Sequence, residues 1–271
     1  MSYLLVISEK LKRISGKSTI FAQKNKLMFL TAIQDFVEQK QYPVFSPRAV
    51  FFDMDGVLFD SMKFHARAWV QALRDVGIPF TEYEAYMNEG RTGRSTIDGA
   101  YNNIYQRNAT EQEKQNIYGL KTSYFETYGP SPVMPYAREL LRLIKSQGLQ
   151  IFVVTGSGQA SLIDNLQLHF PGIFQKEKMV TAFDVKKGKP HPEPYLMALA
   201  KAGLNPWEAL VVENAPLGVE SAVGAGIFTI GVNTGPLPAE VLSRPGASVV
   251  LESMKDLYDK WTDFSSLWLN K

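Results

Sequence analysis

The chain has 271 residues, of which 45% are hydrophobic and 21% are charged. These values are ordinary for a globular protein and do not indicate a disordered chain, a fibre or a membrane protein. The sequence contains no cysteine, which excludes disulfides, thiolate metal sites and cysteine nucleophiles. Any chemistry must therefore come from carboxylates, hydroxyls, amines and the three histidines.

Charge is unevenly distributed along the chain. Residues 1–46 contain seven Lys or Arg and three acidic residues, so this segment has a net charge of +4 and the remainder a net charge of −2. An acidic body gives no reason to expect a nucleic-acid partner. The early apolar run at residues 3–7 is too short for a signal peptide or a membrane span, so we expect a cytoplasmic protein with no membrane partner. No pattern predicts an oligomeric partner.

The first 47 residues have the composition of an appendage and linker. A basic stretch precedes an amphipathic segment at residues 27–39, and a linker containing two prolines follows at residues 42–47. We expect a helix packed on the body, or sequence upstream of the true start codon. An organelle-targeting leader is a third alternative.

From residue 48 onward, short apolar runs without alternation are separated by helical patterns. The expected strands are residues 49–52, 151–154, 209–212, 228–232 and 248–251. The expected helices between them are residues 136–147, 160–169, 194–202 and 217–225. Runs of this kind are typical of a parallel sheet that is buried on both faces. The sequence therefore predicts an α/β fold with a doubly wound, Rossmann-like parallel sheet.

About a hundred residues separate the first two expected strands, far more than a crossover connection needs. Helix-forming patterns occur there at residues 66–76, 83–89, 95–105 and 111–128. We predict an inserted all-α cap domain at residues 62–132, with the core formed by residues 48–61 and 133–271. A helical insertion beside the first strand is positioned to act as a lid.

Two carboxylates follow the first expected strand, at the edge of the sheet where ligands bind in doubly wound folds. Asp53 and Asp55 can face one pocket if the backbone turns sharply, and Gly56 permits that turn. One carboxylate can then attack phosphorus while the other exchanges a proton with the leaving oxygen. A pair of solvated loop aspartates is the structural alternative.

Two further segments supply groups that bind phosphate. Thr155, Gly156 and Ser157 follow the second expected strand and offer hydroxyls and turn amides. Lys189 lies in a proline-rich turn, where its ammonium can neutralise both a phosphate and a nucleophile. An ordinary loop and a surface lysine are the structural alternatives.

A polar pair, Glu213 and Asn214, follows the third of the polar-ended runs. Its oxygens suit Mg²⁺, a hard cation that shares carboxylates with substrate phosphates. A helix-capping pair before Pro216 is the alternative interpretation.

The motifs Asp-x-Asp-Gly-Val, Thr-Gly-Ser, Lys-Pro and Glu-Asn, in this order, resemble those of the haloacid dehalogenase superfamily of phosphatases and phosphomutases. The resemblance covers about residues 48–262. It implies that Asp53 forms an aspartyl phosphate, and that Asp55 protonates the leaving group and then activates water. Thr155 and Lys189 would bind the transferring phosphoryl group. The resemblance also implies a Mg²⁺ cofactor held by Asp53, the backbone carbonyl of Asp55, Glu213 and Asn214.

The helical insertion resembles the cap of the β-phosphoglucomutase-like subgroup. Residues 64–69 match the hinge segment of that mutase, with His65 and Trp69 at the positions of its histidine and tryptophan. In the subgroup this histidine assists the acid/base aspartate. For His65, capping a helix or satisfying a buried polar group is the alternative.

Two departures from the mutase pattern affect the predicted substrate. Asn214 stands where the subgroup usually has Asp, and Gly93 stands where the mutase carries the cap arginine for the distal phosphate. The cap motif that begins at Glu89 and the Glu-Asn-Ala-Pro motif resemble a branch that hydrolyses inorganic pyrophosphate. We expect Glu89 to reach the metal and restore the charge lost at Asn214; a solvated helix-end carboxylate is the alternative. Arg91 and Arg94 are candidate substrate-binding residues.

We therefore predict a Mg²⁺-dependent phosphohydrolase that forms an aspartyl phosphate and acts on a small phosphate substrate such as inorganic pyrophosphate. A β-phosphoglucomutase and a broad sugar-phosphate phosphatase are the catalytic alternatives. A non-catalytic binding module that kept the fold is the third, because fold alone does not establish activity.

Overall fold

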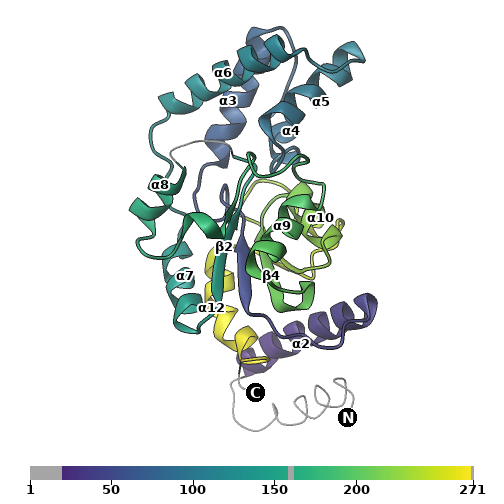
Figure 1. The fold of residues 1–271 in the computed structure, drawn as a ribbon, viewed down its shortest axis with the longest axis vertical. Coiled ribbons are helices and arrows are strands. Elements are labelled where there is room, and N and C mark those ends of the chain that lie inside the picture. Colours follow the sequence, from purple (N-terminus) through teal and green to yellow (C-terminus); the bar gives the residue numbers. More distant parts are fainter. Residues whose placement is uncertain (1–19, 158–161, 270–271) are drawn as a thin grey trace.

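A six-stranded parallel sheet lies at the centre of the computed structural model, which describes residues 20–157 and 162–269 (Figure 1). Its order is β3-β2-β1-β4-β5-β6, so the chain winds outward in both directions from β1, and the predicted fold class is confirmed. The strands are β1 (Ala49–Phe52), β2 (Gln150–Val154), β3 (Met179–Val180), β4 (Ala209–Glu213), β5 (Phe228–Val232) and β6 (Val249–Leu251). The apolar runs missed β3, because two residues are too few to form a recognisable run.

The core helices cover both faces of the sheet. They are α7 (Ala137–Ser146), α8 (Leu162–His169), α9 (Glu193–Ala202), α10 (Pro216–Gly224), α11 (Glu240–Ser243) and α12 (Met254–Ser265), with short 3₁₀ helices at Lys176–Lys178 and Pro206–Glu208. Successive residues of β1 point to opposite faces: Val50 and Phe52 pack with α7 and α12, while Ala49 and Phe51 pack with α9. Both faces are therefore buried, as the unalternating runs predicted.

Helix α2 (Ile20–Lys40) packs against the core at the end of the sheet opposite the cap (Figure 1). Phe29 stacks on Phe264 of α12 with ring centroids 4.4 Å apart, and Phe36 contacts Phe228 of β5 at 5.4 Å. Of the alternatives for the appendage, the packed helix is the one that the structure has over residues 20–40; residues 1–19 lie outside the described part. None of the described helices is both long and apolar enough to cross a membrane.

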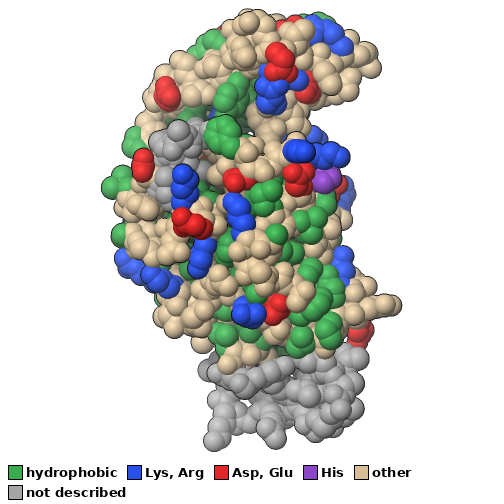
Figure 2. Space-filling model, in the orientation of Figure 1, with side chains coloured by type: hydrophobic (Ala, Val, Ile, Leu, Met, Phe, Trp, Pro, Cys, Tyr) green, Lys and Arg blue, Asp and Glu red, His purple; other side chains and the backbone are tan. Residues whose placement is uncertain are grey.

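Four helices inserted after β1 form the cap, which overhangs the core and leaves a hollow on one side (Figure 2). They are α3 (Met62–Asp75), α4 (Glu82–Met87), α5 (Gly93–Tyr105) and α6 (Glu111–Thr127). Thr81 and Thr110 each form a capping box, which fixes the start of α4 and of α6. The cap has an apolar cluster of its own that includes Leu73, Ile97 and Ile117, so it is a separately packed unit placed above the carboxyl ends of the strands.

Candidate active site

The turn after β1 places two aspartates at the carboxyl end of the central strand. Asp53 continues the strand with a hydrogen bond from its amide to the carbonyl of Val212, at 3.0 Å. Gly56 has a φ of +84°, and a Cβ there would lie 2.0 Å from Nδ2 of Asn214. Glycine is thus required both for the conformation and for the close approach of Asn214. Asp53 and Asp55 line the same cavity.

Lys189 joins two buried carboxylates, those of Asp53 and Glu213. Its Nζ donates to Oδ1 of Asp53 at 2.5 Å, to Oε1 of Glu213 at 2.6 Å and to the carbonyl of Val154 at 3.0 Å. Burial opposes the charge, but attraction to Asp53 and Glu213 prevails and raises the pKa of Lys189 above its usual value. The three donors of the ammonium are all used, so Lys189 is a fixed cation at the nucleophile.

Glu213 is fully buried and holds Lys189 in place. Its Oε1 accepts from Lys189 and from the hydroxyl of Tyr195, and its Oε2 accepts from the amides of Asn214 and Ala215. These four bonds fill the acceptor sites of the carboxylate. The structure therefore does not support the predicted role of Glu213 as a direct metal ligand, because its oxygens are committed to protein donors.

Asn214 connects the core to the cap. Its Nδ2 donates to Oε1 of Glu89 at 2.8 Å, whereas its Oδ1 is buried and has no hydrogen-bond partner in the part of the chain that the structure describes. Glu89 is 8% exposed, so it is not the solvated carboxylate of the alternative interpretation. Burial first, and then the nearby Asp53, raise the pKa of Glu89 well above its usual value. A buried acceptor without a donor needs a partner.

The donor chemistry around Asn214 fits Mg²⁺. Burial first, and then the carboxylates of Glu213 and Asp55, raise the pKa of Asp53 to about 8, although Lys189 opposes this. The carboxylates of Asp53, Glu213 and Glu89 are all buried near the one ammonium of Lys189. Among the described residues, no three Asp, Glu or His side chains alone surround a metal position. The fitting set is mixed, with carboxylate oxygens of Asp53 and Glu89 and the free amide oxygen of Asn214, all hard ligands.

Asp55 is the first member of a chain of polar groups in which Asp55 and His65 are half-buried and Ser61 and Lys121 are buried. Its Oδ1 accepts from Oγ of Ser61 at 2.6 Å and lies 3.2 Å from Nε2 of His65, while Nδ1 of His65 lies 2.8 Å from Nζ of Lys121. An ammonium can only donate, so Nδ1 accepts and the proton on Nε2 points at Asp55. Burial alone would raise the pKa of Asp55, but attraction to His65 and the bonds from His65 and Ser61 hold it below its usual value.

Lys121 of α6 was not predicted. Burial lowers its pKa to about 8, and its ammonium lies over the rings of Phe125 and Trp69, at 4.9 Å and 5.7 Å from their centroids. Burial and then Lys121 lower the pKa of His65, which favours its neutral form. The only signal in the sequence is that Lys121 stands four residues after the buried Ile117, on the packed face of the helix.

The turn after β2 forms the third side of the cavity. Thr155 and Ser157 both line it. The amide of Ser157 donates to Oγ1 of Thr155 at 3.0 Å, and the amide of Thr155 donates to the carbonyl of Val180 of β3 at 2.9 Å. These bonds fix the turn around Gly156, so the hydroxyls of Thr155 and Ser157 and the amide of Gly156 are the groups that can meet a phosphate.

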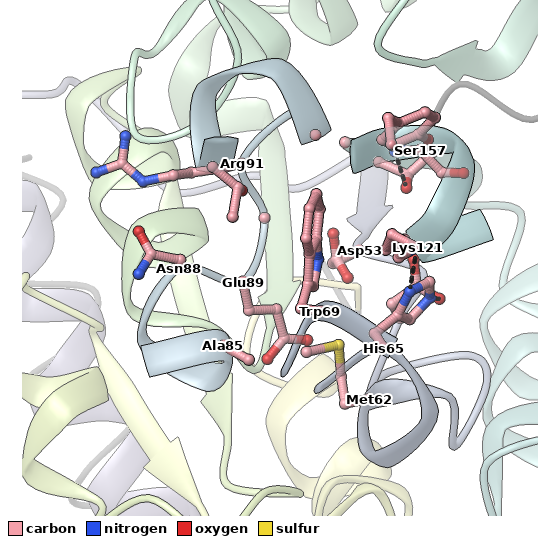
Figure 3. Close-up of a pocket in the computed structure, with 17 residues that line it drawn as sticks. Asp53, Met62, His65, Trp69, Ala85, Asn88, Glu89, Arg91, Lys121 and Ser157 are labelled. Carbon is pink, nitrogen blue, oxygen red and sulfur yellow. Dashed lines mark hydrogen bonds and ion pairs between the residues drawn. The ribbon is translucent and has the colours of Figure 1, made fainter. Parts of the chain in front are cut away.

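The two candidate arginines have different positions. Arg91 lines the cavity, but in Figure 3 its guanidinium points away from Asp53, and it donates to Oγ of Ser95 at 3.2 Å. Arg94 is largely exposed and pairs with Glu111 on the outside of the cap. The structure therefore does not support substrate binding by Arg94, because its position on α5 directs the side chain to solvent.

Cap residues make the cavity small. A Cβ at Gly93 would lie 2.3 Å from Cε2 of Tyr118, so the ring of Tyr118 occupies the space that a side chain at position 93 would need. The cavity enclosed by the residues of Figure 3 has a volume of about 80 Å³. A wider cavity of about 660 Å³ lies between α6 and α8 and shares Asp55, His65 and Ser157 with the first.

A carboxylate at the end of a central parallel strand, a fixed lysine, a phosphate-binding turn and a helical cap define a capped phosphoryl-transfer enzyme. The family model of the haloacid dehalogenase-like hydrolases matches residues 47–226. The chain belongs to this family and is a phosphatase or phosphotransferase.

Individual relatives agree with this assignment. The chain is 27% identical to the β-phosphoglucomutase of Bacillus subtilis (strain 168), over 80% of this chain and 96% of that protein. It is 29% identical to hexitol phosphatase A of Escherichia coli (strain K12), over 78% and 93%. A solved structure, titled a putative β-phosphoglucomutase from Bacteroides vulgatus, is 51% identical with a TM-score of 0.86 and covers 89% of this chain and 98% of that one. The predicted resemblance to the β-phosphoglucomutase-like subgroup is confirmed.

Proposed function

We propose that this protein is a Mg²⁺-dependent phosphohydrolase whose substrate is inorganic pyrophosphate or a phosphate compound of similar size. The observation that carries the proposal is the buried contact between Glu89 of the cap and Asn214 of the core. This contact brings the carboxylate of Glu89 close to the nucleophile, Asp53. Asn214 is uncharged, so Glu89 supplies the negative charge that Asn214 does not. A carboxylate beside a substrate phosphate is repulsive unless a cation lies between them. A cytoplasmic location is part of the same proposal.

The size of the cavity supports a small substrate. Its volume of about 80 Å³ is well below the roughly 300–1,000 Å³ of pockets for drug-sized ligands. Tyr118 closes the space beside Gly93, where an arginine for a distal sugar phosphate would have to stand.

The reaction follows from the positions of the core side chains. Asp53 attacks phosphorus and forms an aspartyl phosphate, and the bond to the leaving phosphate breaks. Thr155 orients the transferring phosphoryl group, and Lys189, whose donors are all held by Asp53, Glu213 and the carbonyl of Val154, supplies positive charge beside it. Asp55 then takes a proton from water, which attacks the aspartyl phosphate and releases Asp53 and a second phosphate.

Mg²⁺, when bound by Asp53, Glu89, Asn214 and the backbone carbonyl of Asp55, would supply positive charge to the phosphoryl oxygens.

The contacts of Asp55 suit the second half of the reaction, in which water is activated. Because His65 and Ser61 favour its ionised form and hold its pKa below the usual value, Asp55 is present as a proton acceptor and has no proton to donate. A departing phosphate needs little help from an acid, whereas a departing sugar alkoxide needs a proton. The electrostatics at Asp55 therefore favour a phosphoanhydride over a sugar monoester.

One observation favours a second candidate, a sugar-phosphate phosphatase or mutase. The wider cavity behind His65 has room for a sugar. The names of similar proteins, among them a phosphorylated carbohydrates phosphatase of Thermotoga maritima that is 30% identical over 67% of this chain, point to the same substrate class.

The test is kcat/KM with Mg²⁺ on two substrates in parallel, inorganic pyrophosphate and β-glucose 1-phosphate with a bisphosphate primer. We expect a strong preference for pyrophosphate. In Glu89→Ala, kcat/KM on pyrophosphate should fall by at least about tenfold. Glu82→Ala, an exposed glutamate at the start of α4, is the matched control and should behave as wild type. Efficient formation of glucose 6-phosphate, or a Glu89→Ala variant with unchanged kcat/KM on pyrophosphate, would overturn the proposal.

A further inference from the structure

The cap loop, residues 89–92, rests directly on two core turns at points where a glycine stands. A Cβ at Gly156 would lie 2.7 Å from the carbonyl oxygen of Gly90 and 3.0 Å from that of Arg91. A Cβ at Gly188 would lie 2.8 Å from Cγ2 of Thr92. Contacts shorter than 3.0 Å essentially never occur for real Cβ atoms, so an alanine at either position must displace the cap-loop atoms that it meets.

Neither glycine is needed for its own backbone conformation. The described glycines with positive φ do not include Gly156 or Gly188, so an L-residue can adopt the conformation of both. The three atoms nearest to each Cβ position all belong to the cap loop: the carbonyl groups of Gly90 and Arg91 at Gly156, and Cγ2, the amide nitrogen and Cβ of Thr92 at Gly188. The closest obstacle to a side chain at either position is therefore the cap loop.

The two glycines belong to the turns that hold the phosphate-binding groups. Gly156 stands between Thr155 and Ser157, and Gly188 directly precedes Lys189. The cap loop thus contacts the core through these turns, and it carries Glu89 at one end. The height of the loop above the turns decides whether Oε1 of Glu89 can stay 2.8 Å from Nδ2 of Asn214.

We propose that Gly156 and Gly188 are positioning residues that form a seat for the cap loop and set the depth at which Glu89 enters the site. This inference rests on the proposed function of Glu89. Alanine at either position raises the closed loop and withdraws the Glu89 carboxylate, while an open cap tolerates alanine without cost. The substitution therefore shifts the equilibrium from closed to open.

The experiment compares alanine variants that differ in what they meet. In Gly188→Ala the new methyl group meets Cγ2 of Thr92. Thr92→Ser removes Cγ2 and keeps the hydroxyl that caps α5, so it should restore the activity of Gly188→Ala. Gly156→Ala meets backbone carbonyls, which Thr92→Ser leaves in place, so it should not be rescued. Gly99→Ala, with nothing within 4 Å of its Cβ position, is the control and should keep the wild-type kcat/KM. We expect each seat variant alone to lose about 10- to 100-fold in kcat/KM.

Cap position is measured separately by a distance between spin labels. The chain has no cysteine, so Asn103→Cys on the cap and Glu177→Cys on the core, both exposed, give one labelled pair. Without substrate, Gly156→Ala and Gly188→Ala should lengthen the mean distance, and adding Thr92→Ser should restore it only for Gly188→Ala. This readout needs no turnover, and the kinetic series is run on whichever of pyrophosphate and p-nitrophenyl phosphate is hydrolysed. Failure of the pyrophosphate assignment is thus distinguished from failure of the seat.

Three results would overturn the proposal that Gly156 and Gly188 form a seat for the cap loop. The first is wild-type kcat/KM and label distance in both alanine variants. The second is a loss of activity or of folding in Gly188→Ala that adding Thr92→Ser does not reverse. The third is equal rescue of both variants by Thr92→Ser, because the backbone contact at Gly156 would then be irrelevant.

Discussion

The core and the cap each bury one lysine beside the active site, and the two have opposite environments. Lys189 of the core contacts two carboxylates and a carbonyl, and its pKa is raised. Lys121 of the cap contacts His65 and aromatic rings, has no carboxylate at ion-pair distance among the described residues, and its pKa falls to about 8.

The difference lies in how the two lysines are held. In the core the donors of Lys189 and the acceptors of Glu213 are all paired, so the nucleophile is held rigidly before substrate arrives, and the one unpaired core group described above, Oδ1 of Asn214, is the expected metal ligand. The cap half has unpaired donors: among the described residues, Lys121 uses one ammonium donor, toward His65, and the buried Nε of Arg91 has no partner. Buried groups of this kind have a cost unless a ligand pairs with them. We infer that the core supplies chemistry and the cap supplies recognition.

The largest effect is expected at the core lysine. Lys189→Met leaves Asp53 and Glu213 buried without their shared cation, and should lower the free energy of unfolding by about 3–5 kcal/mol and abolish turnover. Chemical denaturation and a kcat measurement check this. Lys187→Met, at an exposed position in the same turn, should change the unfolding free energy by less than about 0.5 kcal/mol. A Lys189→Met protein as stable as wild type would remove the distinction between the two halves.

The cap lysine should behave in the opposite way. The pKa of Lys121 in the folded protein, about 8, is below its ordinary value of 10.5, so between these pH values the unfolded chain binds more protons and stability rises with pH. Relative to Lys121→Met, the wild type should gain on the order of 3 kcal/mol of unfolding free energy across this window. Denaturation curves from pH 7.5 to 10.5 measure the difference. A constant difference would show that Lys121 is not an uncompensated cation.

Moving one carboxylate from Glu89 of the cap to position 214 of the core tests which half of the site must supply the negative charge for Mg²⁺. Glu89→Gln should weaken Mg²⁺ binding by about tenfold, and adding Asn214→Asp should recover much of that loss because the carboxylate returns on the core side. Calorimetric Mg²⁺ titration of the single and double variants checks the expectation. If the double variant binds no better than Glu89→Gln, the carboxylate of Glu89 has a role other than replacing the missing charge.

The smallest effect is expected on the outer surface of the cap. Arg94→Ala should leave kcat/KM within about twofold of wild type, because an exposed ion pair contributes little and the side chain does not line the cavity. Steady-state kinetics on the preferred substrate test this. A large rise in KM would mean that α5 rotates during turnover and brings Arg94 inward.

Much of this arrangement could be predicted from the sequence, because parallel strands deliver whatever follows them to one edge of the sheet. That rule alone placed Asp53, Thr155 and Glu213 together. It could not assign the exact contacts of Glu213, since acceptor sites are filled by groups such as Tyr195 whose positions depend on packing. Lys121 was missed because its meeting with His65 depends on how α6 crosses α3, which no local pattern encodes.

The contact between α2 and α12 joins two helices that lie far apart in the sequence. Nδ2 of Asn25 donates to Oδ2 of Asp263, 238 residues away, and Phe29 stacks on Phe264. During synthesis at about 5–20 residues per second, α2 leaves the ribosome roughly 10–50 seconds before its partner exists. Phe29 therefore lacks Phe264 for that time, although Phe36 can already pack on Phe228 of β5, so the contact between α2 and α12 forms late, and a nascent chain without α12 exposes the part of α2 that this helix covers.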